Sequence, residues 1–238
     1  MSSFLPDFIT REPPTFPDYI TVKHNARAGR IVMRLNTKTR KIDLTIPKWM
    51  SLHDAKAFTD QNKCWIDEKL QTLGQSIPFE HGQTIPLLGR DRTITIQENP
   101  NSARTTFTLT AHELLMMTHL ENPAPKIEKH LKTIARQEFE PRLHDKAAQI
   151  GHNINKLTLR DPLSRWGSCS HDGNIMLSWR LILAPPAAMD YVIAHEVAHL
   201  RHMDHSKAFW ALCKDLSDDY NAGHSWMREH GNTLMRFG

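Results

Sequence analysis

Cysteine is scarce in this chain of 238 residues, and its three cysteines are far apart. Cys64, Cys169 and Cys213 include no Cys-x-x-Cys pair. An odd and scattered set does not form a disulfide framework, and it lacks the paired spacing of a zinc ribbon. The sequence therefore excludes the small disulfide-rich and zinc-ribbon classes of protein.

Long apolar runs are also missing. The most apolar stretch, LSWRLILAPPAAM, is interrupted by Arg180 and by the Pro185–Pro186 pair, and it is too short and too polar to cross a bilayer. Residues 1–20 contain acids and prolines where a signal peptide needs a basic end and an apolar centre. We therefore expect a cytoplasmic protein with no membrane partner, long enough for one large domain or two small ones.

Positive charge is concentrated near the N-terminus, although the net charge is only +4. Residues 21–50 contain eight Lys and Arg side chains and one acid, Asp43. Such a stretch can bind an anionic partner, either nucleic acid or a nucleotide. No aromatic residues alternate with these charges, as stacking on bases would require. The pattern favours a solvated strand face and keeps nucleic acid as an alternative partner.

The first half of the chain reads as strands with one helix. Residues 31–46 hold two alternating apolar segments, which are typical of a hairpin. Residues 51–74 fit one helix that is capped by Ser51 and stopped by Gly74, and residues 84–96 read as strands around a turn at Gly89. Residues 97–105 look like a loop, and we place a domain boundary there. We therefore expect three parts: an irregular segment 1–20, a β-rich region 21–105 with one helix, and a mixed domain 106–238.

The second half alternates between helices and short strands, so we expect an α+β fold. Residues 123–151 predict a long helix in which Pro141 produces a kink or a break. The Pro185–Pro186 pair suits the start of a helix that we take over residues 186–203. Three strands are expected before that helix and two short helices after it, at residues 156–161, 165–170, 174–184, 206–217 and 220–230.

The stretch YVIAHEVAHLRHMDHS, residues 191–206, holds four histidines, and the helix has two faces. An apolar stripe marks the core face, and a second stripe about 200° around the helix carries the histidines. These histidines either lie on a solvated face or hold a metal ion. The apolar stripe is Met189, Ile193, Val197 and Leu200, and the second stripe is Tyr191, His195, His199 and His202.

The spacing of the histidines suits a metal ion. His195 and His199 are four residues apart, so their rings can converge on one ion. Zinc at a catalytic site needs a third protein ligand and an open position. His202 is excluded because it lies about 10 Å along the axis from His195. His205 can return to the ion only if the helix ends near Met203–Asp204 and the chain turns.

Glu196 completes the pattern His-Glu-x-x-His. It lies about 100° around the helix from His195, beside the ion and not on it. A carboxylate there can take a proton from water that a metal has acidified and pass it to a leaving group. A zinc site that only stabilises an interaction module would need four ligands and no base, so Glu196 favours an enzyme.

Several segments of the chain resemble those of a known family. SRWGSCS, LAPPAAMDYVIAHEVAHLRHMDHS and FWALC resemble the YgjP-like zinc metallohydrolases, which are related to the gluzincin metallopeptidases. The resemblance is strongest over residues 125–238. It implies that residues 106–238 form a gluzincin-like metallohydrolase domain, a small sheet packed on the motif helix. It further implies one zinc ion held by His195, His199 and His205, with Glu196 as general base.

The resemblance leaves the reaction open. A metallopeptidase that cleaves peptide bonds is the leading hypothesis. The family has also been linked to pyrophosphatase activity on nucleoside triphosphates such as UTP, which the basic region and Arg165, Arg180 and Arg201 would suit. No carboxylate cluster of the kind that gathers magnesium accompanies these arginines. A third alternative is a protease that acts on DNA-associated proteins, since such proteases share the histidine spacing.

Further residues are candidates for contact with a substrate. Arg165 and Trp166 precede a strand that is expected to lie across the cleft, where Arg165 could stabilise an oxyanion or hold a phosphate. Tyr191 lies one turn before His195 and could donate to an intermediate. Each of the three also has a purely structural explanation by packing. Cys169 has no partner base in the sequence, so a small buried residue is favoured over a nucleophile.

Overall fold

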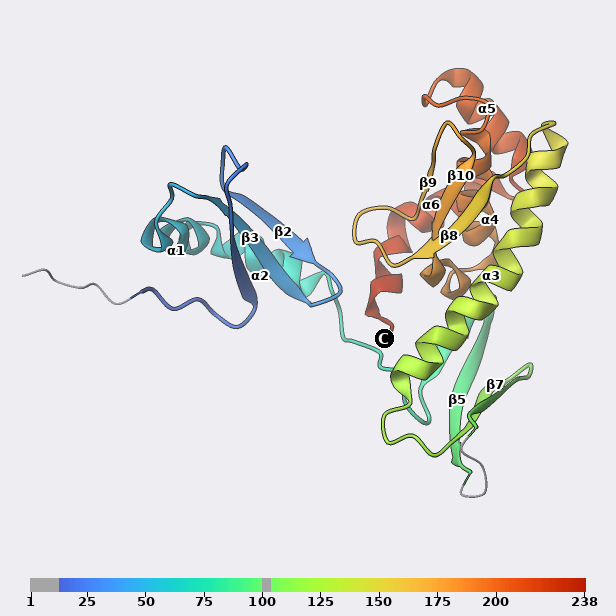
Figure 1. The fold of residues 1–238 in the computed structure, drawn as a ribbon, viewed down its shortest axis with the longest axis horizontal. Coiled ribbons are helices and arrows are strands. Elements are labelled where there is room, and N and C mark those ends of the chain that lie inside the picture. The colour runs from blue at the N-terminus through green and yellow to red at the C-terminus, as the bar shows by residue number, and fades with distance from the viewer. Residues whose placement is uncertain (1–12, 100–103) are drawn as a thin grey trace, which may run out of the picture. The chain divides into compact units, whose positions relative to one another are not determined.

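The structure is a computed structural model that describes residues 13–99 and 104–238. It divides into two compact units, residues 1–74 and residues 75–238, which are described one at a time (Figure 1). Both units contain helices and strands, so the mixed α and β composition that the sequence predicts is confirmed.

The first unit is a three-stranded sheet with two helices. The predicted hairpin is confirmed as β2 and β3, which pair antiparallel. A further strand that the sequence pattern did not predict, β1, pairs parallel to β3. Alternate residues of β3 (Ile42, Leu44 and Ile46) are fully buried, and Leu44 and Ile46 pack with Ala55 of α1. The bounds are β1 Ile20–Asn25, β2 Val32–Asn36, β3 Lys41–Pro47, α1 Leu52–Gln61 and α2 Lys63–Gln71.

The single helix expected over residues 51–74 is wrong, because the helix is interrupted at Asn62. Ser51 caps its start as predicted, with its Oγ accepting from the Asp54 backbone N–H at 3.1 Å. At Asn62 the side-chain amide donates to the carbonyl of Phe58 at 2.8 Å. Asparagine side chains compete in this way for backbone carbonyls, which favours a break between α1 and α2.

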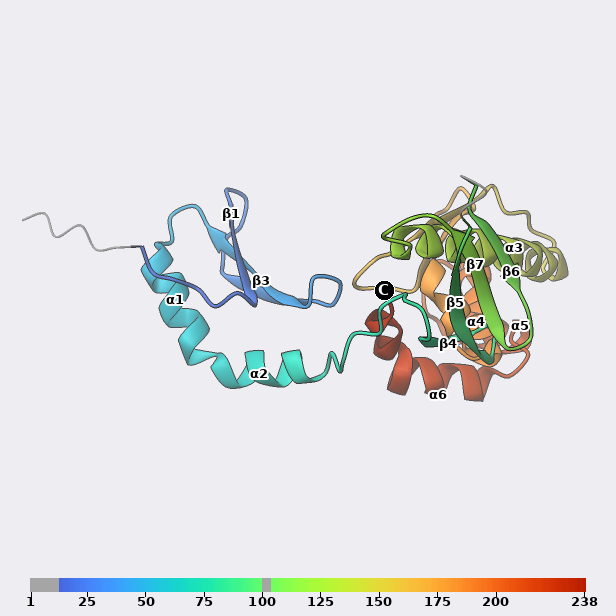
Figure 2. The same cartoon turned by 90° about the horizontal axis from the view of Figure 1, so that it is seen from below.

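The second unit begins with a four-stranded sheet in the order β4-β5-β7-β6 (Figure 2). Leu88 and Gly89 have φ of 53° and 73°, so the predicted turn at Gly89 is confirmed as a tight hairpin turn. The boundary expected at residues 97–105 falls between β5 and β6 of this one sheet, whereas the compact units divide after Gly74. The domain ranges drawn from the sequence stay a prediction. The bounds are β4 Thr84–Leu87, β5 Arg90–Glu98, β6 Thr106–Leu109 and β7 Glu113–Thr118.

The long helix α3, Ala124–Gln149, runs through Pro141 without interruption, so the alternative of a break is wrong. Proline removes a hydrogen bond from the helix interior. Next to it, the Arg142 guanidinium donates to the carbonyl of Glu138 at 2.7 Å and thereby supplements the bonding of that turn. Neither α3 nor any other helix in the described ranges is long and apolar enough to cross a membrane. The cytoplasmic location stays a prediction.

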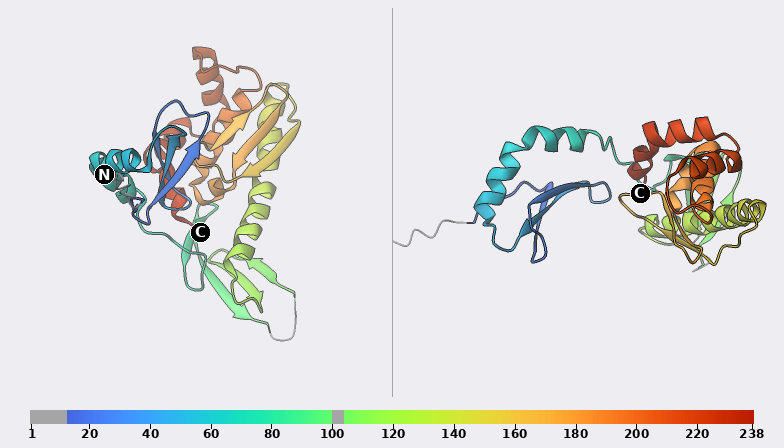
Figure 3. Two further views of the ribbon diagram at one scale, coloured as in Figure 1. Left: turned by 60° about the vertical axis from the view of Figure 1, so that its left-hand side comes forward. Right: turned by 90° about the horizontal axis from the view of Figure 1, so that it is seen from above.

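A second sheet, in the order β8-β10-β9, packs on the motif helix α4 through its edge strand β9. The third expected strand stops at Ser178, and the buried residues that follow form a 3-10 helix, in which consecutive side chains can all be buried. Helix α4 lies between α3 and α6 (Figures 2 and 3). The bounds are β8 Lys156–Arg160, β9 Gly167–Cys169, β10 Asn174–Ser178, η1 Trp179–Leu183, α4 Pro186–Ala198, α5 Lys207–Leu216, α6 Tyr220–His230 and η2 Gly231–Arg236.

A buried ion pair and a close helix contact hold α4 in place. Lys146 of α3 lies 2.7 Å from the Asp190 carboxylate of α4, and both side chains are buried. Lys146 also donates to the carbonyl of Leu216, and Asp190 accepts from the backbone N–H of Asp218 at 2.8 Å. On another side, Gly223 of α6 meets α4 so closely that a Cβ there would lie 2.5 Å from the Cβ of Tyr191.

Candidate metal centre

The motif helix ends earlier than the sequence predicted. α4 stops at Ala198 and not at residue 203, because Leu200 and Arg201 donate to carbonyls three residues back, at 3.0 and 3.2 Å. These bonds tighten the last turn and start the reversal of the chain. The Ser206 side chain then caps α5 by accepting from the Phe209 backbone N–H at 3.3 Å. The turn that His205 needs is therefore present, but it begins before Met203.

The reversal brings three histidines together. Ligand nitrogens of His195, His199 and His205 all lie within 4.8 Å of one another. The Nε2 atoms of His195 and His205 are 3.3 Å apart. A tetrahedral zinc ion with Zn–N bonds of about 2.0–2.1 Å places neighbouring nitrogens about 3.3 Å apart. The donor set and this separation fit a zinc ion, and the ring of Phe209 packs against all three imidazoles.

For His199, the partner of its second ring nitrogen decides which nitrogen faces the ion. His199 Nδ1 lies 3.0 Å from the backbone carbonyl of His202, which holds the proton on Nδ1 and leaves Nε2 free for a metal. His202 thus contributes its backbone, while its ring lies outside the cluster. Burial, with His199 and His205 nearby, lowers the pKa of His195 to about 4. Metal binding requires the neutral imidazole that this pKa favours.

Glu196 lies beside the cluster against strand β9. Its side chain is only 4% exposed, and its Oε2 has no hydrogen-bond partner among the described residues. A Cβ at Gly167 would lie 2.5 Å from Glu196 Cγ and 2.6 Å from Cδ, so the carboxylate needs glycine at that position. Burial raises the pKa of Glu196 to about 8, against a lowering effect of Arg165. A carboxyl group with a pKa near neutral can both take and give a proton.

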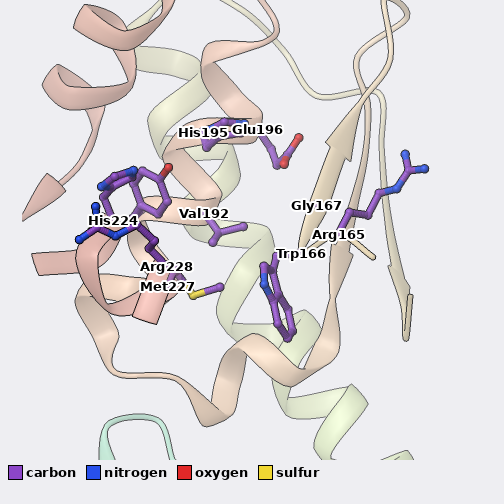
Figure 4. A pocket seen from close by; sticks show the side chains of 10 residues that line it. Arg165, Trp166, Gly167, Val192, His195, Glu196, His224, Met227 and Arg228 are labelled. Carbon is purple, nitrogen blue, oxygen red and sulfur yellow. The ribbon is translucent and has the colours of Figure 1, made fainter. Parts of the chain in front are cut away.

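Two cavities meet at Glu196. One, of about 330 Å³, lies beside Glu196 and His195 and is closed by Trp166 and by residues of α6 (Figure 4). Trp166 and Met227 point toward each other there, whereas the Arg165 side chain extends to the other side of its strand. The other cavity, of about 480 Å³, lies along β9 and is lined by all three clustered histidines. Gly167 and Met227 were not anticipated from the sequence as parts of a site.

Arg165, Trp166 and Tyr191 all line the first cavity. Arg165 is exposed and also lines the cavity that contains the histidines. Tyr191 is buried, its ring lies edge-on to His195 and His224, and burial raises its pKa. Contact of these three side chains with a substrate stays a prediction.

The other two arginines that suited a nucleotide are engaged within the fold. Arg180 is buried and binds both oxygens of the Asp161 carboxylate at 2.6 and 3.1 Å. Arg201 donates to the carbonyl of Ile150 at 2.7 Å. Neither lines the two cavities at Glu196. Burial and Glu196 raise the pKa of Cys169 to about 11, which keeps its thiol protonated and argues against a nucleophile.

A family model described as YgjP-like, metallopeptidase domain, matches residues 32–230, which is most of the chain. The chain belongs to the YgjP-like family. The resemblance seen in the sequence is therefore confirmed. As a YgjP-like metallopeptidase domain, the chain is assigned to the metal-dependent hydrolases, and the histidine cluster is a place where it could bind a metal. The chain has no significant match among curated proteins or among solved structures.

Proposed function

We propose that this YgjP-like protein is a zinc-dependent peptidase with a gluzincin-like site. His195, His199 and His205 would hold the ion, and Glu196 would act as general base and then as general acid. The observation that carries the proposal is the cluster itself, three imidazoles with ligand atoms within 4.8 Å of one another. Next to it lies the buried Glu196, whose Oε2 has no hydrogen-bond partner in the described part of the chain.

In this proposal each residue of the site has a defined task. The His202 carbonyl orients His199, and Gly167 leaves room for the Glu196 side chain. Glu196 takes a proton from the attacking water and gives it to the nitrogen that leaves. When bound, zinc supplies Lewis-acid polarisation of the scissile carbonyl and lowers the pKa of water to about 7.

The edge strand β9 supports a peptide as substrate. Among the strands that the structure describes, β9 pairs with β10 alone, and Gly167, Ser168 and Cys169 line the cavity that contains the histidines. An extended peptide can add itself to such an edge through main-chain hydrogen bonds. This recognition is independent of the peptide sequence and would lay a peptide bond along α4, where β9 packs.

A nucleotide substrate has less support. Of the three arginines that suited it, only Arg165 lines a cavity at the cluster. In the basic stretch, Asp43 accepts from Asn36 at 2.9 Å and lies 3.6 Å from Lys23, so part of the charge is neutralised within the sheet. Binding of nucleic acid, and action on DNA-associated proteins, stay predictions.

The test is a substrate panel for the zinc-loaded protein. Unfolded casein and a mixture of nucleoside triphosphates are incubated separately with wild type and with Glu196→Gln, which controls for contaminating hydrolases. The proposal predicts new peptide termini by mass spectrometry with wild type alone and no release of pyrophosphate. Pyrophosphate released by wild type alone, with casein intact, would refute it in favour of a nucleotide hydrolase.

A further inference from the structure

The cavity of about 330 Å³ beside Glu196 is lined mainly by residues outside the histidine cluster. We propose that it binds one side chain of the substrate, that of the residue whose nitrogen leaves, and that it selects large apolar side chains. This inference rests on the proposed peptidase function. It adds a specificity pocket whose walls come from α4, α6 and the segment before β9.

The position of the cavity decides which substrate residue it meets. Its walls include Glu196 and His195, but not His199 or His205. Glu196 has to reach the leaving nitrogen to protonate it, so the residue that carries this nitrogen lies against Glu196. The side chain of that residue is then closest to this cavity. A volume of about 330 Å³ lies within the range of about 300–1,000 Å³ that is usual for small-ligand pockets.

The chemistry of the walls decides what the cavity accepts. Val192 and Tyr191 are buried, and Trp166 and Met227 are half-buried and point toward each other (Figure 4). Methionine adapts its shape to irregular apolar groups. Arg228, a positively charged residue of the lining, is exposed and lies 3.2 Å from the carboxylate of its neighbour Glu229. Arg165 also lines the cavity, but its side chain extends to the other side of its strand (Figure 4). In the apolar part, a charged substrate side chain would therefore lose hydration without meeting either arginine.

The side chains of Trp166 and Met227 close one end of the pocket. Trp166 is packed against η2, where a Cβ at Gly231 would lie 3.3 Å from its Nε1. The same Cβ would lie 3.4 Å from Met227 Cε, so tryptophan and methionine close one end of the cavity together. Replacement of Met227 is therefore the change that alters the volume of the pocket while the histidines and Glu196 remain in place.

The experiment compares three variants with wild type on a library of peptides, with cleavage sites identified by mass spectrometry. Met227→Trp fills the pocket and Met227→Ala enlarges it. Ser225→Trp adds the same bulk at an exposed position of α6 that does not line the pocket, and is the matched control. Zinc content and thermal unfolding are measured for all four proteins.

Wild type should prefer Leu, Met or Phe over Gly after the cleaved bond by about tenfold or more, the discrimination that apolar pockets reach. Met227→Trp should lose cleavage before Phe by about tenfold and retain cleavage before Ala and Gly, and Met227→Ala should extend the preference to Trp. Ser225→Trp should match wild type. An equal rate before all residues, or an unchanged preference in both Met227 variants, would overturn the pocket.

A binding measurement separates failure of the pocket from failure of the peptidase function. N-acetylphenylalanine amide and N-acetylglycine amide are titrated into ¹⁵N-tryptophan-labelled protein, and the Trp166 indole resonance is followed. A shift with the phenylalanine amide only, abolished in Met227→Trp, supports the pocket even if no peptide is cleaved. Peptide cleavage without such a shift would overturn the pocket and leave the peptidase intact, whereas absence of both would refute both.

Discussion

Gly167→Ala is expected to disable the site while the fold and the metal centre remain intact. An added Cβ would lie 2.5 Å from Glu196 Cγ, which is about 0.9 Å closer than the 3.4 Å at which ordinary contact begins. The atoms in the way belong to a side chain, so Glu196 moves and the backbone does not. A displacement of about 1 Å can lower a rate about 10²-fold, which corresponds to about 2.7 kcal/mol of activation free energy. The expected loss in kcat/KM is therefore about 10²-fold.

The assay measures kcat/KM on a peptide substrate together with zinc content and the midpoint of thermal unfolding. Gly29→Ala is the matched control, because a Cβ at Gly29 meets nothing within 4 Å. Gly167 does not have a positive φ, so alanine can adopt its backbone conformation. If Gly167→Ala keeps activity within about threefold of wild type, the position of Glu196 is not critical. If it loses zinc or stability, the effect does not act through Glu196, and the reasoning is also refuted.

Four other substitutions test the ligands and the frame that holds them. His205→Ala should lose zinc, whereas His202→Ala should keep about one ion per chain because only the His202 backbone carbonyl contacts a ligand; zinc analysis of the purified variants decides, and the opposite result would overturn the ligand set. Lys146→Met should lower the free energy of unfolding by about 3–5 kcal/mol, since it leaves the buried Asp190 carboxylate without its cation; a denaturant titration that shows no change would contradict this. Gly223→Ala should cost about 1–3 kcal/mol by overpacking the contact between α4 and α6, and equal melting temperatures would show that the helices can separate freely.

Local patterns account for most of what could be predicted from the sequence. Ser51 and the apolar alternation of β3 act through contacts with near neighbours in the chain, so the cap and the hairpin are visible in the sequence. The His-Glu-x-x-His spacing acts within one helix in the same way, and it pointed to His195 and His199. His205 was expected only if the chain turned after the helix, and the structure brings all three histidines together. Their role as ligands stays a prediction.

The features that could not be predicted depend on contacts between distant segments. The early end of α4 depends on a turn that the His202 carbonyl and the cap of α5 stabilise. The close approach of Gly167 to Glu196 requires β9 to pack on α4, which no local pattern encodes. Met227 reads as an ordinary helix residue until α6 places it opposite Trp166.

The most direct test of the central claim is a zinc titration of the metal-free protein, with peptide cleavage and bound zinc measured at each step for wild type and for Glu196→Gln. Cleavage by wild type should rise to a plateau at one equivalent of zinc. Glu196→Gln should bind the same equivalent and cleave about 10²- to 10⁴-fold more slowly, which is the usual contribution of a general acid–base group. Cleavage that does not depend on zinc, or a Glu196→Gln protein as active as wild type, would contradict the proposed zinc peptidase.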